Sequence, residues 1–175
     1  MQRMNPVLAR WNSTDPAAAA EEILPCCGSR AWAAELAARR PVADEDHLLI
    51  TSDAVWVGLP EAAWQEAFDS HPRIGQQKAK AATETSLGWS ATEQSAAMSA
   101  HDAAKLDLAE ANQRYEEKFG RIFIICASGR SASEILAALE SRMNNDAATE
   151  VREAAEQQRK ITQLRLRRWL GVNPQ

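Results

Sequence analysis

The chain has 175 residues and a formal net charge of −4, with 45% hydrophobic and 25% charged residues. This length predicts a single domain with a real core, and the composition is ordinary for a soluble globular protein. The negative charge disfavours a nucleic-acid partner, and no apolar stretch approaches the roughly 20 residues of a membrane span.

Helix-forming residues dominate the first seventy positions, where alanine is mixed with Leu, Glu, Gln and Arg. Capping residues or prolines open each predicted helix: Asp15 before Pro16, then Ser29, Asp44 and Pro60. The helices predicted from these starts cover about 16–24, 30–40, 45–58 and 60–70. Residues 70–89 then break the pattern, and we expect an irregular, polar stretch there, part of which can form a helical turn.

Ser90 is predicted to begin the longest helical region, which bends near 99–101 and ends at Gly120. The β-branched run from about Ile122 to Ala127 follows. Because a solitary strand has no pairing partner, we expect a buried extended segment there. Two further helices open near residues 131 and 146, and the second reaches about residue 170. The fold class is therefore predicted to be all-α, a single-domain bundle of about eight helices spanning residues 1–175.

The three cysteines are Cys26, Cys27 and Cys126. Adjacent cysteines pair poorly with each other, so we expect free thiols in a reducing compartment. The first residues lack an apolar signal core, and the C-terminus is not a peroxisomal tripeptide. We therefore expect a cytoplasmic protein.

His71 lies before Pro72 in "SHPRIG", a stretch in which the proline restricts the backbone and Gly75 releases it. A general acid or base must be held within hydrogen-bond reach of its target, so this stiff setting suits a catalytic histidine. A solvated or structurally bonded histidine is the alternative. Arg73 is either an anion ligand or an exposed arginine.

The stretch Ser90, Ala91, Thr92, Glu93 and Gln94 is predicted to start a helix. Ser-x-x-Glu is a capping box, and a helix N-terminus also offers free N–H groups to an anion. The Gln94 amide can donate and accept, which suits a cyclic urea. Plain helix capping is the alternative.

The extended segment contains Phe123, Ile124, Ile125, Cys126 and Ala127. If it pairs with no strand, its N–H and C=O groups need partners, and a ligand rich in amide groups can supply them. A core role is the alternative, with Cys126 an inert thiol.

No metal-ligand spacing or glycine-rich phosphate loop is present, so we expect no metal site. Five cations lie between residues 159 and 168, which the helix dipole favours near a C-terminus. Arg165 alone is placed to turn inward to a carboxylate.

Five motifs occur in the order and at separations similar to those of a known family: "HPRIGQQKA", "SATEQSAA", "NQRYEEKFG", "FIICASGRSASEIL" and "KITQLRLRRWL". The chain resembles the 2-oxo-4-hydroxy-4-carboxy-5-ureidoimidazoline (OHCU) decarboxylase family from about residue 5 to 170, and "LPCCGSRAWAAELAARRP" looks like its bacterial branch. One departure is Arg121-Ile122, where many members have an aromatic residue and often a proline.

The resemblance implies an all-helical enzyme of urate degradation, commonly a homodimer, that uses no metal or organic cofactor. Its substrate is OHCU and its product is (S)-allantoin. The substrate carries its own electron sink, because the leaving carboxylate sits beside a carbon doubly bonded to nitrogen.

By motif, the resemblance implies that His71 is catalytic and that Glu93 orients the substrate or the histidine. It further implies contacts of the ligand with Pro72, with 90–94 and with 123–127; Arg165 is a weaker choice for the substrate carboxylate. Two other functions stay open: a helical assembly partner of a urate-pathway enzyme, and a hydrolase of a related cyclic ureide.

Overall fold

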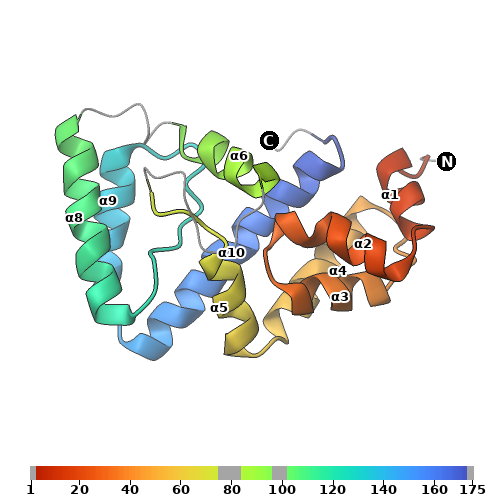
Figure 1. The fold of residues 1–175 in the computed structure, drawn as a ribbon, viewed down its shortest axis with the longest axis horizontal. Coiled ribbons are helices and arrows are strands. Elements are labelled where there is room, and N and C mark those ends of the chain that lie inside the picture. Colours follow the sequence, from red (N-terminus) through yellow and green to blue (C-terminus); the bar gives the residue numbers. More distant parts are fainter. Residues whose placement is uncertain (1–2, 75–83, 96–101, 173–175) are drawn as a thin grey trace. The chain divides into compact units, whose positions relative to one another are not determined.

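A computed structural model describes residues 3–74, 84–95 and 102–172, and in these ranges the chain is helical without any strand (Figure 1). The predicted all-α class is confirmed. The helices are α1 (Pro6–Asn12), α2 (Pro16–Ile23), α3 (Arg30–Ala38), α4 (Glu45–Val57), α5 (Glu61–Asp69), α6 (Glu84–Glu93), α8 (Asp102–Phe119), α9 (Ala132–Arg142) and α10 (Ala147–Trp169), with a 3-10 turn, η1, at Leu24–Cys26.

The chain forms two compact units. The first unit combines residues 1–67 with 159–175, and the second is the continuous stretch 68–158. Helix α10 runs through 147–169, so its N-terminal half belongs to the second unit and its C-terminal half to the first. The single domain predicted for residues 1–175 stays a prediction.

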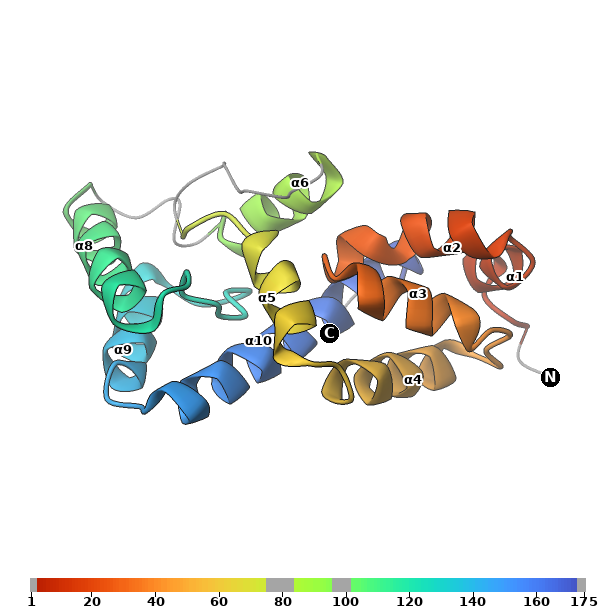
Figure 2. The ribbon, with the colours of Figure 1, turned by 60° about the horizontal axis from the view of Figure 1, so that its bottom comes forward.

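In the first unit, α3 packs against both α2 and α4 (Figure 2). The predicted helix starts are confirmed, because Asp15, Ser29 and Asp44 each accept a hydrogen bond from a backbone N–H of the first turn. Trp32 of α3 is fully buried, and its Nε1 donates to Ser52 Oγ of α4 at 3.1 Å.

Helix α1 was not predicted, although Asn5 and Pro6 mark its start. The Asn5 side chain accepts from Val7 N, and the proline occupies the first turn. Trp11 anchors the helix: it is fully buried, and its Nε1 donates to Ala19 O at 3.0 Å.

In the second unit, α8 and α9 lie side by side in both views (Figures 1 and 2). Residues 122–127 form no helix and no strand, and most of them are buried, so the predicted extended segment is confirmed. The core of this unit combines the segment with the two helices, and its buried members are Leu108, Ala111, Tyr115, Phe123, Ile125, Ala127, Ala132, Ile135 and Leu139.

A buried ionic network ties α8, α9 and α10 of the second unit together. Arg142 Nε donates to Glu150 Oε1 at 2.9 Å, and the Tyr115 hydroxyl donates to the same oxygen at 2.5 Å. Arg142 Nη1 also donates to the Ile124 carbonyl at 2.7 Å. Burial, followed by the hydrogen bond to Glu150, raises the pKa of Tyr115 above its ordinary value, so the hydroxyl stays a donor. The network therefore fixes the extended segment to two helices.

The helix predicted to begin at Ser90 is wrong, because α6 begins at Glu84 and Ser90 lies in its interior. The buried residues of α6 are Ser86, Ser90 and Glu93, spaced by four and three positions. Since this inward face is polar, no apolar period marks the helix in the sequence. The proposed anion site at a Ser90 helix start is lost with it, because an N–H this far into a helix is bonded within the helix.

The other predictions for residues 70–120 have mixed outcomes. Residues 70–74 are irregular as predicted, whereas 84–89 are helical. Glycine ends α8 as predicted: Gly120 adopts a φ of 71°. Gly75, the rest of the loop to 83, and the predicted bend at 99–101 lie outside the described residues.

The ionic network predicts a large stability loss on Arg142→Met. The substitution leaves the Glu150 carboxylate and the Ile124 carbonyl buried without the guanidinium, so the free energy of unfolding should fall by about 3–5 kcal/mol. Urea denaturation measures it. Arg152→Met is the matched control, because Arg152 is exposed on α10, the helix that carries Glu150, and it should change stability by at most about 0.5 kcal/mol. Equal effects of the two variants would contradict the role of the network.

Candidate functional site

His71 lies two residues beyond the end of α5, in a backbone held at both sides. Its N–H donates to the Phe68 carbonyl at 3.1 Å, and the following Pro72 is buried. The ring is half-buried, and its Nε2 lies 2.6 Å from Oε1 of Gln158 on α10. The Gln158 side chain is fully buried. The histidine singled out from the sequence is therefore bonded through its ring to a side chain that is itself fixed.

The extended segment is held through its backbone. The Cys126 N–H donates to Gln157 Oε1 at 3.0 Å, and the Ile124 carbonyl accepts from Arg142. A ligand was one possible partner for such backbone groups, and for these two the structure shows a protein side chain as a partner. Contact of the segment with a ligand stays a prediction. Cys126 is half-buried rather than fully in the core.

Gln157 and Gln158 are neighbours on α10, and together they connect His71 with the 123–127 segment. The amide oxygen of Gln157 holds the Cys126 N–H, while that of Gln158 meets the His71 ring. A second bond, from Gln157 Nε2 to Glu153 Oε1 at 3.0 Å, fixes the orientation of the Gln157 amide. Two of the three predicted site segments, the one at His71 and the one at 123–127, thus contact the same turn of α10.

Sequence reasoning missed this turn of α10, although a clue was present. The buried positions of α10 recur at helical spacing through Val151, Ala154, Ile161 and Leu166. Gln158 falls in the same row, where an apolar residue is the norm. A glutamine that is fully buried in an apolar row indicates a specific hydrogen-bond partner.

The third predicted segment, 90–94, presents its polar side chains inward from α6. Ser90, Glu93 and Gln94 are buried, whereas Ala91 is half-buried and Thr92 is exposed. The Thr92 hydroxyl donates to the Gly88 carbonyl at 3.1 Å, within the helix. The inward face therefore offers a hydroxyl, a carboxylate and an amide.

Glu93 lies at the C-terminal end of α6, where a carboxylate does not stabilise the helix. It is 7% exposed, and it is the last residue of α6. Negative charge is disfavoured at the C-terminal end of a helix dipole, and burial of a carboxylate costs free energy. The dipole of α6 therefore gives this carboxylate no stabilisation.

Arg73 lies in the same stretch as His71 and forms a bidentate ion pair with Glu116 of α8. Its Nε and Nη2 donate to the two carboxylate oxygens at 2.6 and 3.0 Å. A small cavity of about 230 Å³ adjoins the pair, and the buried Asn112 side chain lines it. The pair ties the loop after His71 to α8.

Arg165 belongs to the first unit. It is 1% exposed, and its Nη1 donates to the Pro25 carbonyl at 3.1 Å. The predicted inward turn is confirmed, while its role as a carboxylate ligand stays a prediction. The neighbouring thiols are fully buried, and burial raises the pKa of Cys27 to about 12.

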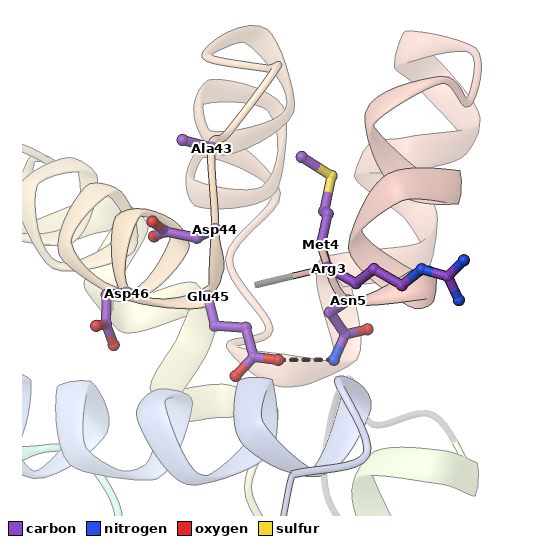
Figure 3. Close-up of a pocket in the computed structure, with 7 residues that line it drawn as sticks. All are labelled: Arg3, Met4, Asn5, Ala43, Asp44, Glu45 and Asp46. Atoms are coloured by element: carbon purple, nitrogen blue, oxygen red, sulfur yellow. Dashed lines mark hydrogen bonds between the residues drawn. The ribbon is translucent and has the colours of Figure 1, made fainter. Parts of the chain in front are cut away.

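A larger cavity, of about 540 Å³, opens in the first unit between the N-terminal residues and the start of α4 (Figure 3). Its rim is closed by a hydrogen bond from Asn5 Nδ2 to Glu45 Oε1 at 2.8 Å. None of the catalytic or binding residues predicted from the sequence lines it. Asp44, which does line it, caps α4. We assign it no chemistry.

Within the described ranges, no group of three His, Cys, Asp or Glu residues is arranged to hold a metal ion. In the same part of the chain, no helix combines the length and apolarity that crossing a membrane requires.

Comparison with known proteins points to one family. The OHCU decarboxylase family model matches residues 12–167, across both units. The uric acid degradation bifunctional protein TTL of Arabidopsis thaliana is 38% identical over 142 residues, which are 81% of this chain but only 44% of that protein. The 2-oxo-4-hydroxy-4-carboxy-5-ureidoimidazoline decarboxylase of Amia calva is 34% identical over 138 residues, covering 67% of this chain and 78% of that protein.

Solved structures agree. A crystal structure of OHCU decarboxylase in the presence of (S)-allantoin is 35% identical and has a TM-score of 0.75, covering 86% of this chain and 98% of that one. A crystal structure of (S)-allantoin synthase, 21% identical with a TM-score of 0.67 over 93% of this chain and 53% of that one, shares the fold. From the family match over residues 12–167 and the relatives at 34–38% identity, the chain belongs to the OHCU decarboxylase family.

Proposed function

We propose that this protein decarboxylates OHCU to (S)-allantoin in urate degradation. The observation that carries the proposal is the family match over residues 12–167, which takes in the held histidine, the polar face of α6 and the extended segment. A relative of 35% identity was crystallised in the presence of (S)-allantoin, which supports a small ureide as the ligand.

The reaction needs positioning and one proton. The bond between the ring carbon and the carboxylate breaks, CO₂ leaves, and the electron pair moves into the neighbouring carbon–nitrogen double bond. A proton is then added from one face to the neighbouring carbon, which bears the ureido group, and the face of addition fixes the configuration of the product. The hydroxyl on the carbon that lost CO₂ gives its proton to the ring nitrogen and becomes a carbonyl. A rigid histidine and oriented polar groups meet these needs.

In this proposal His71 delivers the proton and Glu93 orients the substrate or the histidine. Polar groups on the inner face of α6, from Ser90 and Gln94, bind the ureide, with Ala91 and Thr92 in the same turn. Pro72 and the 123–127 segment contact the ring, and Arg165 is a weaker candidate for the substrate carboxylate. The homodimer and the cytoplasmic location implied by the resemblance stay predictions, and light scattering of the purified protein tests the first.

Catalysis should be visible as stereoselective release of CO₂. Freshly generated OHCU should decay faster with enzyme than without it, release one CO₂ per molecule, and give allantoin of one sign of optical rotation. Trapping of CO₂ together with polarimetry measures this. Prior treatment with EDTA should leave the rate unchanged, since the reaction as proposed uses no metal.

Racemic allantoin formed at the uncatalysed rate would overturn the proposal and leave a binding or assembly role. Ring opening without release of CO₂ would instead indicate a hydrolase of a cyclic ureide. Loss of activity in EDTA that a single added metal restores would contradict the metal-free mechanism.

The role of Glu93 is tested by Glu93→Gln. A helix cap is excluded as its function, because α6 begins at Glu84, and glutamine keeps the shape of the side chain and its capacity to form hydrogen bonds. Turnover should nevertheless fall about 10²-fold or more, the range of a positioned acid–base group, while the melting temperature barely moves. Steady-state kinetics and calorimetry measure both.

His71→Asn should behave likewise, and the double variant should lose far less than the product of the two losses, because groups acting as a unit are not additive. Glu110→Gln is the matched control, since Glu110 is exposed on α8, and it should keep full activity. Near-normal turnover of Glu93→Gln would remove Glu93 from the mechanism.

Contact between the ligand and the 123–127 segment predicts selective protection of one thiol. Cys126 is half-buried, whereas Cys26 and Cys27 are fully buried and burial raises the pKa of both above the ordinary thiol value. Iodoacetamide should therefore modify Cys126 first in the folded protein, and (S)-allantoin should slow that modification. Mass spectrometry of peptides measures it. Modification of Cys126 at the same rate with and without (S)-allantoin would count against contact at this segment.

A further inference from the structure

We propose that Gln158 is a positioning residue that keeps one proton of His71 on Nε2, so that Nδ1 is the ring atom that exchanges a proton with the substrate. The assignment of the tautomer rests on the structure of the second unit. The role of Nδ1 in turnover rests on the proposed function, and the two are tested by separate readouts.

The contact is short, and one of its partners is fully buried. His71 Nε2 lies 2.6 Å from Gln158 Oε1. Gln158 is fully buried in the middle of the continuous α10 helix. Adjacent Gln157 is fixed by bonds to Cys126 and Glu153, which hold the same turn of α10 against the extended segment. The ring of His71 therefore meets an acceptor whose position the helix sets.

An amide oxygen only accepts hydrogen bonds, so the ring nitrogen that faces it must carry the hydrogen. The neutral Nε2–H tautomer and the doubly protonated ring both satisfy this contact, whereas the Nδ1–H tautomer places two acceptors against each other. The proton on Nε2 then stays in place through a catalytic cycle. Because the bond made by one ring nitrogen decides the state of the other, Nδ1 is left to gain and lose the mobile proton.

The chemistry of an amide fits this role better than that of a carboxylate. A carboxylate at this distance would stabilise the protonated ring and make it a weaker acid. The neutral amide orients the ring without adding a charge. A neutral partner therefore suits a histidine that protonates a carbon, because it orients the ring without stabilising the protonated form.

A Gln158 amide that turned its NH₂ group to the ring would instead donate to Nε2 and leave the proton on Nδ1. Nitrogen-15 NMR of the histidine side chains separates these cases, because protonated and unprotonated ring nitrogens resonate far apart. The chain has three histidines, so the His71 signals are assigned by their loss in His71→Asn. Spectra are recorded about two pH units above the ordinary imidazole pKa of about 6.5.

In the wild-type protein, Nε2 of His71 should resonate as protonated and Nδ1 as unprotonated. Gln158→Met removes the acceptor at similar volume, so the His71 signals should move toward a mixture of tautomers, and kcat should fall about 10-fold or more with a smaller change in KM. Gln158→Glu keeps an acceptor and should keep the proton on Nε2. The matched control is Gln113→Met, because Gln113 is exposed on α8, and it should leave both the spectrum and kcat unchanged.

A wild-type His71 with the proton on Nδ1 would overturn the proposal at once, before any variant is made. Unchanged His71 signals in Gln158→Met would do the same. If the spectra behave as expected but the wild-type protein releases no CO₂ from OHCU, the tautomer assignment stands and the proposed function fails.

Discussion

An extended segment buried without a neighbouring strand must find partners for its backbone groups among side chains. Residues 122–127 are such a segment, and two of their groups are satisfied by Arg142 from α9 and Gln157 from α10. Buried polar side chains on two helices follow from this requirement. Glu150 then balances the Arg142 charge, and Tyr115 and Asn145 donate to Glu150. One irregular stretch thus accounts for the buried Arg142, Glu150 and Gln157 of the second unit.

The same unit turns polar faces inward at two further places. Helix α6 buries Ser86, Ser90 and Glu93, and α10 buries Gln158 against the ring of His71. Apolar residues at these positions would stabilise the fold more simply, because burying a polar group costs free energy unless it is hydrogen-bonded. Buried polar groups on two inward faces are what the proposed role, orienting a small and polar ureide, requires.

Local chemistry explains which parts of the fold were predictable. Caps at Asp15, Ser29 and Asp44 and the glycine at 120 are decided by side chains next to the helix ends, so the sequence reveals them. Helix α6 was misplaced because its buried face is polar, and the hydrophobic period that marks a helix is missing. The motifs located His71, but its partner Gln158 lies 87 positions away in the chain, and only the folded structure joins them.

The order of the two units along the chain has a consequence for folding during synthesis. The first unit is made from both ends of the sequence, and its ends are joined by Asn5 Nδ2 donating to the Leu170 carbonyl at 2.9 Å and by the edge contact of Trp11 with Trp169. These contacts cannot form until the last turns of α10 have left the ribosome. The second unit is continuous and is complete at residue 158. Since domains tend to fold as units in the order of their synthesis, the nascent chain is expected to assemble the unit that contains His71 first and to complete the first unit only after α10 has been synthesised.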